Sequence, residues 1–186
     1  KPLHLGHIRN ILLGDSVSKI LDYSGYEIHK TQIINDRGIH ICKSMIAWMK
    51  FGNNGGPTKN ETKGDHYVGE YYVKFNQEYE KQIDELIKNG KDKKYAEENA
   101  QILKDAQSLL RKWEEKDDQV IKIWKKMNSW VMKGFNETLE KLGVVFDSEY
   151  FDPKCDAIKK ALEIMTKKIP TRPTSKRSNP FTINNS

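Results

Sequence analysis

The chain has 186 residues, of which 37% are hydrophobic and 31% charged, and its formal net charge is +6. This composition is typical of a polar globular domain, with or without an insertion, and not of a disordered chain. No apolar run reaches membrane-spanning length, no Cys/His spacing suits zinc, and the two lone cysteines indicate a reducing compartment instead of a disulfide framework.

The first segment, KPLHLGH, covers Lys1–His7 and places His4 and His7 on either side of Gly6. An amphipathic run follows at once, so the pattern predicts a tight turn that opens a helix from about His7 to Tyr23. Helix N-termini attract anions, and a glycine lets a ligand approach the backbone closely. The imidazoles and the backbone N–H groups therefore predict a site for a phosphate or a nucleotide. Because the chain starts inside this motif, we expect it to be a piece of a longer protein.

The next elements predict an αβ unit of a parallel sheet. Residues 26–34 are rich in β-branched and aromatic side chains and predict a strand, after Gly25 ends the first helix. A polar turn, Asn35–Gly38, leads into a predicted helix over about 39–51. Ligands bind at the carboxyl ends of parallel strands, so the His4–His7 turn and the Asn35–Gly38 turn are both expected at that edge.

Helical periodicity then dominates as far as Gly143, after a turn-rich connection over 52–63. Three helices are predicted, over about 65–89, 94–113 and 117–142, with Asp65 as the cap of the first. No strand separates them, so they predict an inserted helical subdomain. A short strand at 144–146 and a helix over about 152–168 follow. The last eighteen residues contain three prolines and little to bury, so residues 169–186 are predicted to be a disordered basic tail.

Net charge gives little information about partners. Residues 167–186 hold five basic side chains and no acidic one, which leaves a net charge of only +1 for the rest of the chain. The basic balance of the whole sequence therefore does not establish a nucleic-acid partner.

Several motifs resemble one known family. HLGH resembles the His-Ile-Gly-His signature of class I aminoacyl-tRNA synthetases, and KPxHxGHxRN, GDS, SGYE and ND-x-G are similar in order and spacing to the arginyl-tRNA synthetases. KGDHYVGEYYVKF and MNSWVMKGFNETLEKLGVVFD also look like the bacterial-type arginyl enzyme. The resemblance covers about residues 1–150. It departs at Arg37, where many members have an aromatic residue, and after Asp147.

The resemblance implies an α/β fold, namely part of the Rossmann-like nucleotide-binding fold of class I synthetases with a helical insertion. Residues 1–51 would form the first part of the catalytic domain, residues 52–143 the insertion, and residues 144–168 a return to the catalytic domain. The tail over 169–186 matches nothing in the family.

The resemblance also implies arginine–tRNA ligase activity, with ATP–Mg²⁺, arginine and tRNA as substrates and no metal held by the protein. His4 and His7 would contact the ATP phosphates, and Lys1, Leu5 and Gly6 would help to bind ATP. Asn35 and Asp36 would lie near the amino acid or the ribose. A monomer in the cytoplasm, without membrane attachment, is expected.

Some of these positions have simpler interpretations. Lys1 is equally well explained as a solvated terminal residue, and Asp36 is better explained as the N-cap of the following helix. His29 and His40 fit an ordinary strand residue and helix residue better than ligands. For the tyrosines of the insertion, Tyr71 and Tyr72, core packing is the better interpretation.

Two alternatives to the ligase function stay open. A second ATP-binding loop of the KMSKS type is absent from the sequence, so we expect these 186 residues alone to be inactive. The chain could instead serve as a non-catalytic RNA- or protein-binding module. It could also belong to a different class I ligase or nucleotidyltransferase that uses the same His-x-Gly-His turn.

Overall fold

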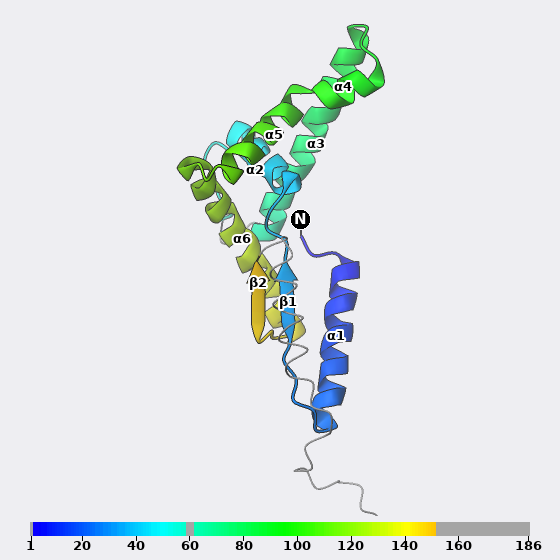
Figure 1. Ribbon diagram of the computed structural model, residues 1–186, viewed down its shortest axis with the longest axis vertical. Coiled ribbons are helices and arrows are strands. Elements are labelled where there is room, and N and C mark those ends of the chain that lie inside the picture. Colours follow the sequence, from blue (N-terminus) through cyan, green and yellow to red (C-terminus); the bar gives the residue numbers. More distant parts are fainter. Residues whose placement is uncertain (1, 59–61, 152–186) are drawn as a thin grey trace, which may run out of the picture. The chain divides into compact units, whose positions relative to one another are not determined.

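A computed structural model describes residues 2–58 and 62–151 (Figure 1). Lys1, Cys155, the predicted helix over 152–168 and the predicted tail over 169–186 lie outside the described residues. The chain divides into two compact units. We call residues 2–3 and 36–141 the helical unit, and residues 4–35 and 142–151 the strand unit.

The strand unit consists of one helix and a two-stranded parallel sheet. Helix α1 spans Leu5–Tyr23, and strands β1 (Thr31–Ile34) and β2 (Ser148–Phe151) pair in register from Thr31–Ser148 to Ile34–Phe151. Figure 1 shows α1 alongside β1 and running in the opposite direction. As predicted, the helix ends before Gly25, whose φ of 91° suits a residue without a Cβ.

Both strands differ from the sequence prediction. The first is shorter than the predicted 26–34, and the second lies at 148–151 and not at 144–146. A pair of contacts joins the chain where the two strands begin: the Asp147 carboxylate accepts from the Lys30 backbone N–H at 2.6 Å, and Asp147 N–H donates to the Lys30 carbonyl at 2.8 Å. Pairing therefore starts one residue later on each side.

Helix α1 has little of its surface covered. Asp15 is its single buried residue among those described, at 6% exposure. Its carboxylate forms ion pairs with Lys19 at 2.7 Å and with Lys30, which precedes β1, at 3.1 Å. Most apolar side chains of α1 are exposed, as the weak amphipathic pattern of the helix allows; these are Leu5, Leu12, Leu13, Val17, Ile20, Leu21 and Tyr23.

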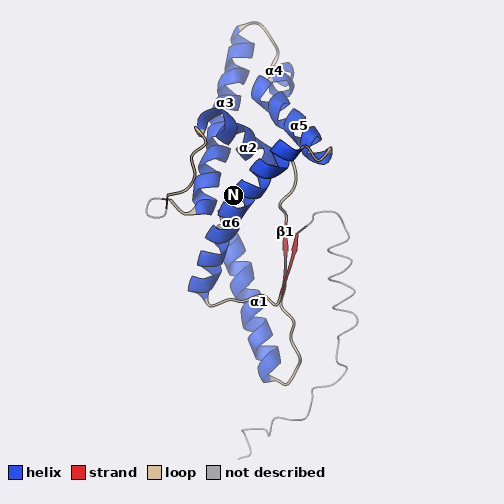
Figure 2. Ribbon diagram, turned by 90° about the vertical axis from the view of Figure 1, so that its left-hand side faces the viewer, coloured by secondary structure: helices blue, strands red, loops and turns tan. Residues whose placement is uncertain are grey.

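Five helices lie in the described part of the helical unit, and Figure 2 draws them, like α1, in blue. They are α2 (Ile39–Phe51), α3 (Gly64–Lys88), α4 (Lys93–Asn99), α5 (Gln101–Glu114) and α6 (Asp118–Leu142). The bounds of α2, α3 and α6 agree with the sequence prediction to within a residue. None of the helices in the described residues combines the length and hydrophobicity that a membrane crossing requires.

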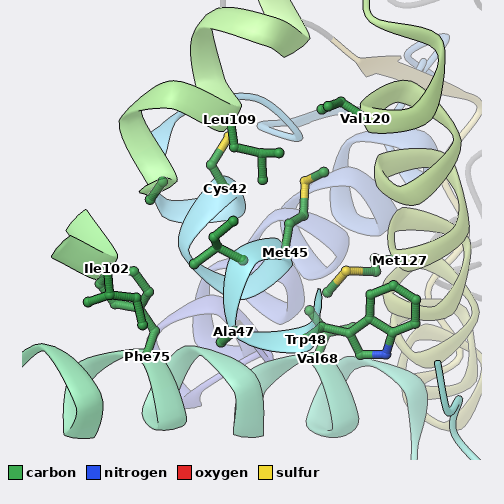
Figure 3. Packing of buried hydrophobic residues seen from close by; sticks show 12 residues of the cluster. Cys42, Met45, Ala47, Trp48, Val68, Phe75, Ile102, Leu109, Val120 and Met127 are labelled. Atoms are coloured by element: carbon green, nitrogen blue, oxygen red, sulfur yellow. The ribbon is translucent and has the colours of Figure 1, made fainter. Parts of the chain in front are cut away.

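Helix α2 is the centre of the core in this unit. Six of its residues are buried, from Cys42 to Trp48, and it packs mainly on α3 and α5. Figure 3 shows Met45 and Trp48 of α2 close to Met127 of α6, with Phe75 of α3 beside Ile102 of α5. The apolar stripes of four helices thus meet in one cluster.

The single helix predicted over 94–113 is wrong, because the chain breaks at Ala100 into α4 and α5. Ala100 has an extended conformation (ψ 127°) and is fully buried. The break leaves the N–H of Ile102 without a helical partner, and the side-chain oxygen of Gln82 on α3 accepts from it at 2.9 Å. A tertiary cap thus replaces the helical hydrogen bonds lost at Ala100.

Asp65 is not the helix cap that the sequence predicts. Lys63 occupies the N-cap position, and Asp65 lies inside the first turn of α3 at 1% exposure. The Lys63 ammonium bonds both the Asp65 carboxylate and the Thr138 hydroxyl of α6. The charge pair therefore joins the start of α3 to α6, next to Gly134, which has no side chain to obstruct it.

Candidate functional site

The His4–Gly6–His7 motif forms a reciprocal cap at the start of α1. His4 is the N-cap, and its Nδ1 accepts from the Gly6 backbone N–H at 3.1 Å. The Nδ1 of His7 in turn accepts from the backbone N–H of His4 at 3.2 Å. The two ring centroids lie 3.8 Å apart. This is the geometry of a capping box in which imidazoles take the roles of the usual oxygen acceptors. The helix therefore begins at Leu5, two residues before the predicted start.

These hydrogen bonds fix the tautomer of both rings. A neutral imidazole that accepts through Nδ1 carries its proton on Nε2, so each ring presents one Nε2–H donor away from the backbone. Desolvation, and next to it the nearby His4 ring, lower the pKa of His7 below its ordinary 6.5. His7 is therefore a neutral donor at pH 7. Both side chains are exposed, so a ligand can reach them.

The backbone donors of this turn are less free than the sequence suggests. The N–H of Gly6 bonds His4 Nδ1, and those of His7 and Ile8 bond the His4 carbonyl at 2.9 and 3.1 Å. An approaching anion thus meets imidazole N–H groups and the positive end of the α1 dipole, while these backbone amides are already engaged.

Gly6 has a role within the motif itself. A Cβ at this position would lie 3.0 Å from Cε1 and 3.1 Å from Nδ1 of His4. A larger residue would therefore crowd the His4 ring, which would have to shift by a few tenths of an ångström. The sequence pattern predicts that the space beside Gly6 is left for a ligand, and in the structure the His4 ring lies on the Cβ side of Gly6.

The remaining candidates of the strand unit lie near the ends of its elements. Leu5 is 86% exposed and adds an open apolar side chain beside the motif. Asn35 directly follows β1 and is exposed. Figure 1 shows the N-terminal end of α1 and the carboxyl end of β1 at the same end of this unit, which is the edge expected for both turns.

Asp36 belongs to the helical unit and is almost covered, at 8% exposure. Its Oδ2 accepts from the Asn128 side-chain amide at 3.4 Å, and its carbonyl oxygen accepts from the Trp124 indole N–H at 2.8 Å. The alternative that it caps the next helix is wrong, because Gly38 is the N-cap of α2 and no side chain caps that helix. Asp36 is therefore hydrogen-bonded to two residues of α6.

Arg37, which follows Asp36 in the chain, contacts two residues of α5. Its guanidinium pairs with Glu114 at 3.1 Å and lies over the Trp113 ring of α5, 4.8 Å from the ring centre. The sequence does not connect this turn with Trp113, Trp124 and Asn128, because they follow it by more than seventy residues. The aromatic residues of α5 and α6 at helical spacing were the only signal, and that signal equally predicts core packing.

The histidines and tyrosines that we judged ordinary have ordinary partners. His29 bonds the Ser148 hydroxyl at 2.9 Å, and His40 bonds the Tyr72 hydroxyl at 3.2 Å. Tyr71 packs against the core as expected, whereas Tyr72 is not among the residues of the core cluster. Within residues 2–58 and 62–151, no group of three His, Cys, Asp or Glu side chains could hold a metal ion.

Known proteins resemble this chain over most of its length. The family model described as the catalytic domain of class I tRNA synthetases (R) matches residues 1–168. Curated relatives named arginine–tRNA ligase include those of Porphyromonas gingivalis W83 (47% identical) and Bacteroides thetaiotaomicron (48%), each over 82% of this chain and 26% of the relative. That of Flavobacterium psychrophilum is 52% identical over 82% of this chain and 25% of the relative. The chain thus spans about a quarter of the length of the relatives it matches.

Proposed function

Because this chain belongs to the family of class I arginyl-tRNA synthetase catalytic domains, we propose that it is the nucleotide-binding portion of an arginine–tRNA ligase. The proposed reaction has two steps. The arginine carboxylate attacks the α-phosphorus of ATP and pyrophosphate leaves, and the arginyl group then passes from the adenylate to a terminal ribose hydroxyl of tRNA. Such chemistry needs positioning and charge stabilisation and no protein nucleophile.

The observation that carries this proposal is the pair of Nε2–H donors at the start of α1. His4 and His7 accept backbone hydrogen bonds through Nδ1, so both rings are oriented before a ligand arrives. We assign to them the binding of phosphate oxygens as negative charge grows in the transition state. Neutral donors suit this role because they need not lose a proton, and the α1 dipole adds to the favourable field.

The proposed roles of the remaining site residues are based on their positions in the chain and on their exposure to solvent. Leu5 and Gly6 supply the exposed edge of the motif to ATP, Lys1 adds a charge before it, and Mg²⁺ arrives with ATP as part of the substrate. Asn35, exposed after β1, is the residue proposed to contact arginine or the ribose. Asp36 is covered, so its proposed role is to hold the turn that presents Asn35.

We further propose residues 52–143 as a helical insertion into the catalytic domain. The long helices α3 to α6, without a strand among them, support this division. Arginine, ATP and tRNA are the proposed partners, and the proposed state is a cytoplasmic monomer. The free thiol of Cys42 is in keeping with a reducing compartment.

Binding of ATP–Mg²⁺ to this chain, measured by calorimetry, tests the role of the imidazoles. Asparagine keeps an acceptor at the position of Nδ1 and removes the donor at Nε2. His4→Asn and His7→Asn should therefore keep the helix, seen by circular dichroism, and weaken ATP binding about tenfold each. His29→Gln, far from the motif in sequence, is the matched control and should change nothing.

The glutamine variants give the complementary result. In His4→Gln and His7→Gln the side-chain amide lies near the Nε2 position, so they should keep more ATP affinity than the asparagine variants. Equal ATP affinity in wild type and both asparagine variants would remove the phosphate-binding role. RNA binding without any nucleotide binding would favour the alternative of a non-catalytic module.

A further inference from the structure

Helix α6 carries a run of positive charge that the average composition conceals. From Gln119 to Asn136 the chain has eighteen residues with four lysines and no acidic residue. We call these lysines, which are Lys122, Lys125, Lys126 and Lys133, the lysine face. All four belong to the helical unit.

The lysine face is turned to solvent because the other side of α6 is in the core. Val120 and Met127 are buried, and the tryptophans of α6 pack partly buried against the same cluster. The exposed residues of the run, apart from its first residue, are the four lysines with Ser129 and Asn136. At 1.5 Å per residue, Lys122 and Lys133 are about 16 Å apart along the helix axis.

The charge of the lysine face is not neutralised by the protein. Among the described residues, none of its four ammonium groups lies within ion-pair distance of a carboxylate. Lysines elsewhere in the helical unit do find partners, such as Lys50 with Asp105 at 2.6 Å. The lysine face is thus a linear set of uncompensated charges.

One of these charges is held in place. The Lys126 ammonium lies 4.9 Å from the ring centre of Trp48 and 5.3 Å from that of Trp130, which face each other edge to face. Cation–π contact with two indoles limits the freedom of a side chain that is otherwise flexible. A cation fixed in position loses less entropy when it meets an anion.

We propose that the lysine face binds the phosphate backbone of RNA. The row of uncompensated positive charges favours a linear polyanion with regularly spaced phosphates as the ligand. The choice of RNA among such polyanions rests on the proposed function. An anionic membrane fits less well: surface helices bury an apolar face in lipid, whereas the apolar face of α6 is covered by its own core. The tRNA substrate would then be held by α6 through phosphates, without reading its sequence.

Salt-dependent binding tests this proposal. The probe is a fluorescein-labelled RNA hairpin of about twelve base pairs, with affinity measured by anisotropy between 50 and 200 mM salt. The triple variant Lys122→Gln, Lys125→Gln, Lys133→Gln leaves Lys126 in its aromatic contact. It should bind at least tenfold more weakly at the lower salt and lower the log–log salt slope by about 2, since each lost phosphate contact removes 0.7–0.9.

Two controls make the result specific. The triple variant Lys88→Gln, Lys94→Gln, Lys104→Gln removes the same charge from exposed positions on α3, α4 and α5, and should change the slope by less than about 1. Replacing Lys122, Lys125 and Lys133 by arginine should restore the wild-type slope, which separates charge from folding.

Equal slope changes in both glutamine triples would overturn the proposal. So would loss of binding to phosphatidylserine vesicles with an unchanged RNA slope. Calorimetry with ATP on the same variants separates the two proposals. If ATP binding is unchanged and the salt slope of RNA binding is reduced, the result supports RNA binding by the lysine face. If ATP does not bind to any of these proteins, the result contradicts the proposed nucleotide site and leaves the RNA result unaffected.

Discussion

His7 Nδ1 accepts a hydrogen bond from the backbone N–H of His4 at 3.2 Å, so the ring of the second histidine is tied to the backbone of the first. The Nδ1 atom of His4 in turn accepts a hydrogen bond from the backbone N–H of Gly6. The two rings are therefore one unit, and neither can turn without breaking a backbone hydrogen bond. Because the acceptor is Nδ1 in both, the protons face away from the chain.

The tautomer of His7 can be measured directly. Long-range ¹H–¹⁵N spectra should show a pyridine-type Nδ1 and a pyrrole-type Nε2 at neutral pH. The ring should titrate below 6.5, because burial and the adjacent His4 ring disfavour its charged form. In His4→Asn the titration of His7 should move upward. A midpoint of His7 at or above 6.5 in the wild type would contradict this account.

Gly134→Ala should unfold the contact between α3 and α6. The new Cβ would overlap the Asp65 carboxylate, which is 1% exposed and cannot move away without breaking its pair with Lys63. We expect a loss of about 2 kcal/mol or more in the free energy of unfolding, measured by urea denaturation.

The comparison for this variant is Gly14→Ala. Gly14 lies in α1 with no other group within 4 Å of its would-be Cβ, so alanine should stabilise the helix by about 0.5–1 kcal/mol. If both substitutions had the same small effect, the close fit of Asp65 against Gly134 would be wrong.

Asp15 makes the stability of the strand unit sensitive to acid. Hydrogen bonds from Lys19 and then Lys30 lower the pKa of its carboxyl below the ordinary 3.8, although burial acts in the opposite direction. A lowered folded-state pKa stabilises the fold above pH 3.8, and this contribution is lost as pH falls through the folded-state pKa. The helical signal and unfolding free energy between pH 2 and 7 should show this loss.

Asp15→Asn removes that dependence. The variant should lose about 1–2 kcal/mol at pH 7 and show a flatter acid limb, whereas Asp22→Asn, at an exposed position of the same helix, should behave as wild type. An identical acid limb in wild type and Asp15→Asn would show that the two lysines do not stabilise this carboxylate.

Cys42 should be inert in the folded protein. It is 2% exposed, and burial raises the pKa of its thiol to about 11, so only about one molecule in a thousand is a thiolate at pH 8. In a Cys155→Ser background, Ellman's reagent should detect no thiol within minutes, and one thiol after denaturation. Rapid reaction without denaturant would place Cys42 outside the core.

Local signals in the sequence were sufficient for several helices. The glycines before and after α2 and the glycine after α6 mark true ends, and the apolar spacing between them predicts the faces that meet in the core. The break at Ala100 has no such signal. It depends on Gln82, whose side chain accepts from the N–H of Ile102, twenty residues later, in place of a helical hydrogen bond.

In the strands and the site, too, local sequence signals predict some features, while others depend on residues far away in the chain. The sequence spacing of His4 and His7 is enough to identify them as a pair at a helix start, but only the structure shows that their rings cap the helix. Asp36 could not be understood from its neighbours, because Trp124 and Asn128 are 88 and 92 residues away. Strand propensity predicted 26–34 as one strand, while the register depends on a contact with Asp147.

The pairing of β1 with β2 also has a consequence in time. Thr31 and Ser148 are register partners in the sheet, and 116 residues of chain, including all of α2 to α6, lie between them. At 5–20 residues per second, a ribosome needs about 6–23 s to make that interval. During synthesis β1 therefore cannot pair with β2 until the helices between them have been made, and the edge that β2 later covers stays open to other strands.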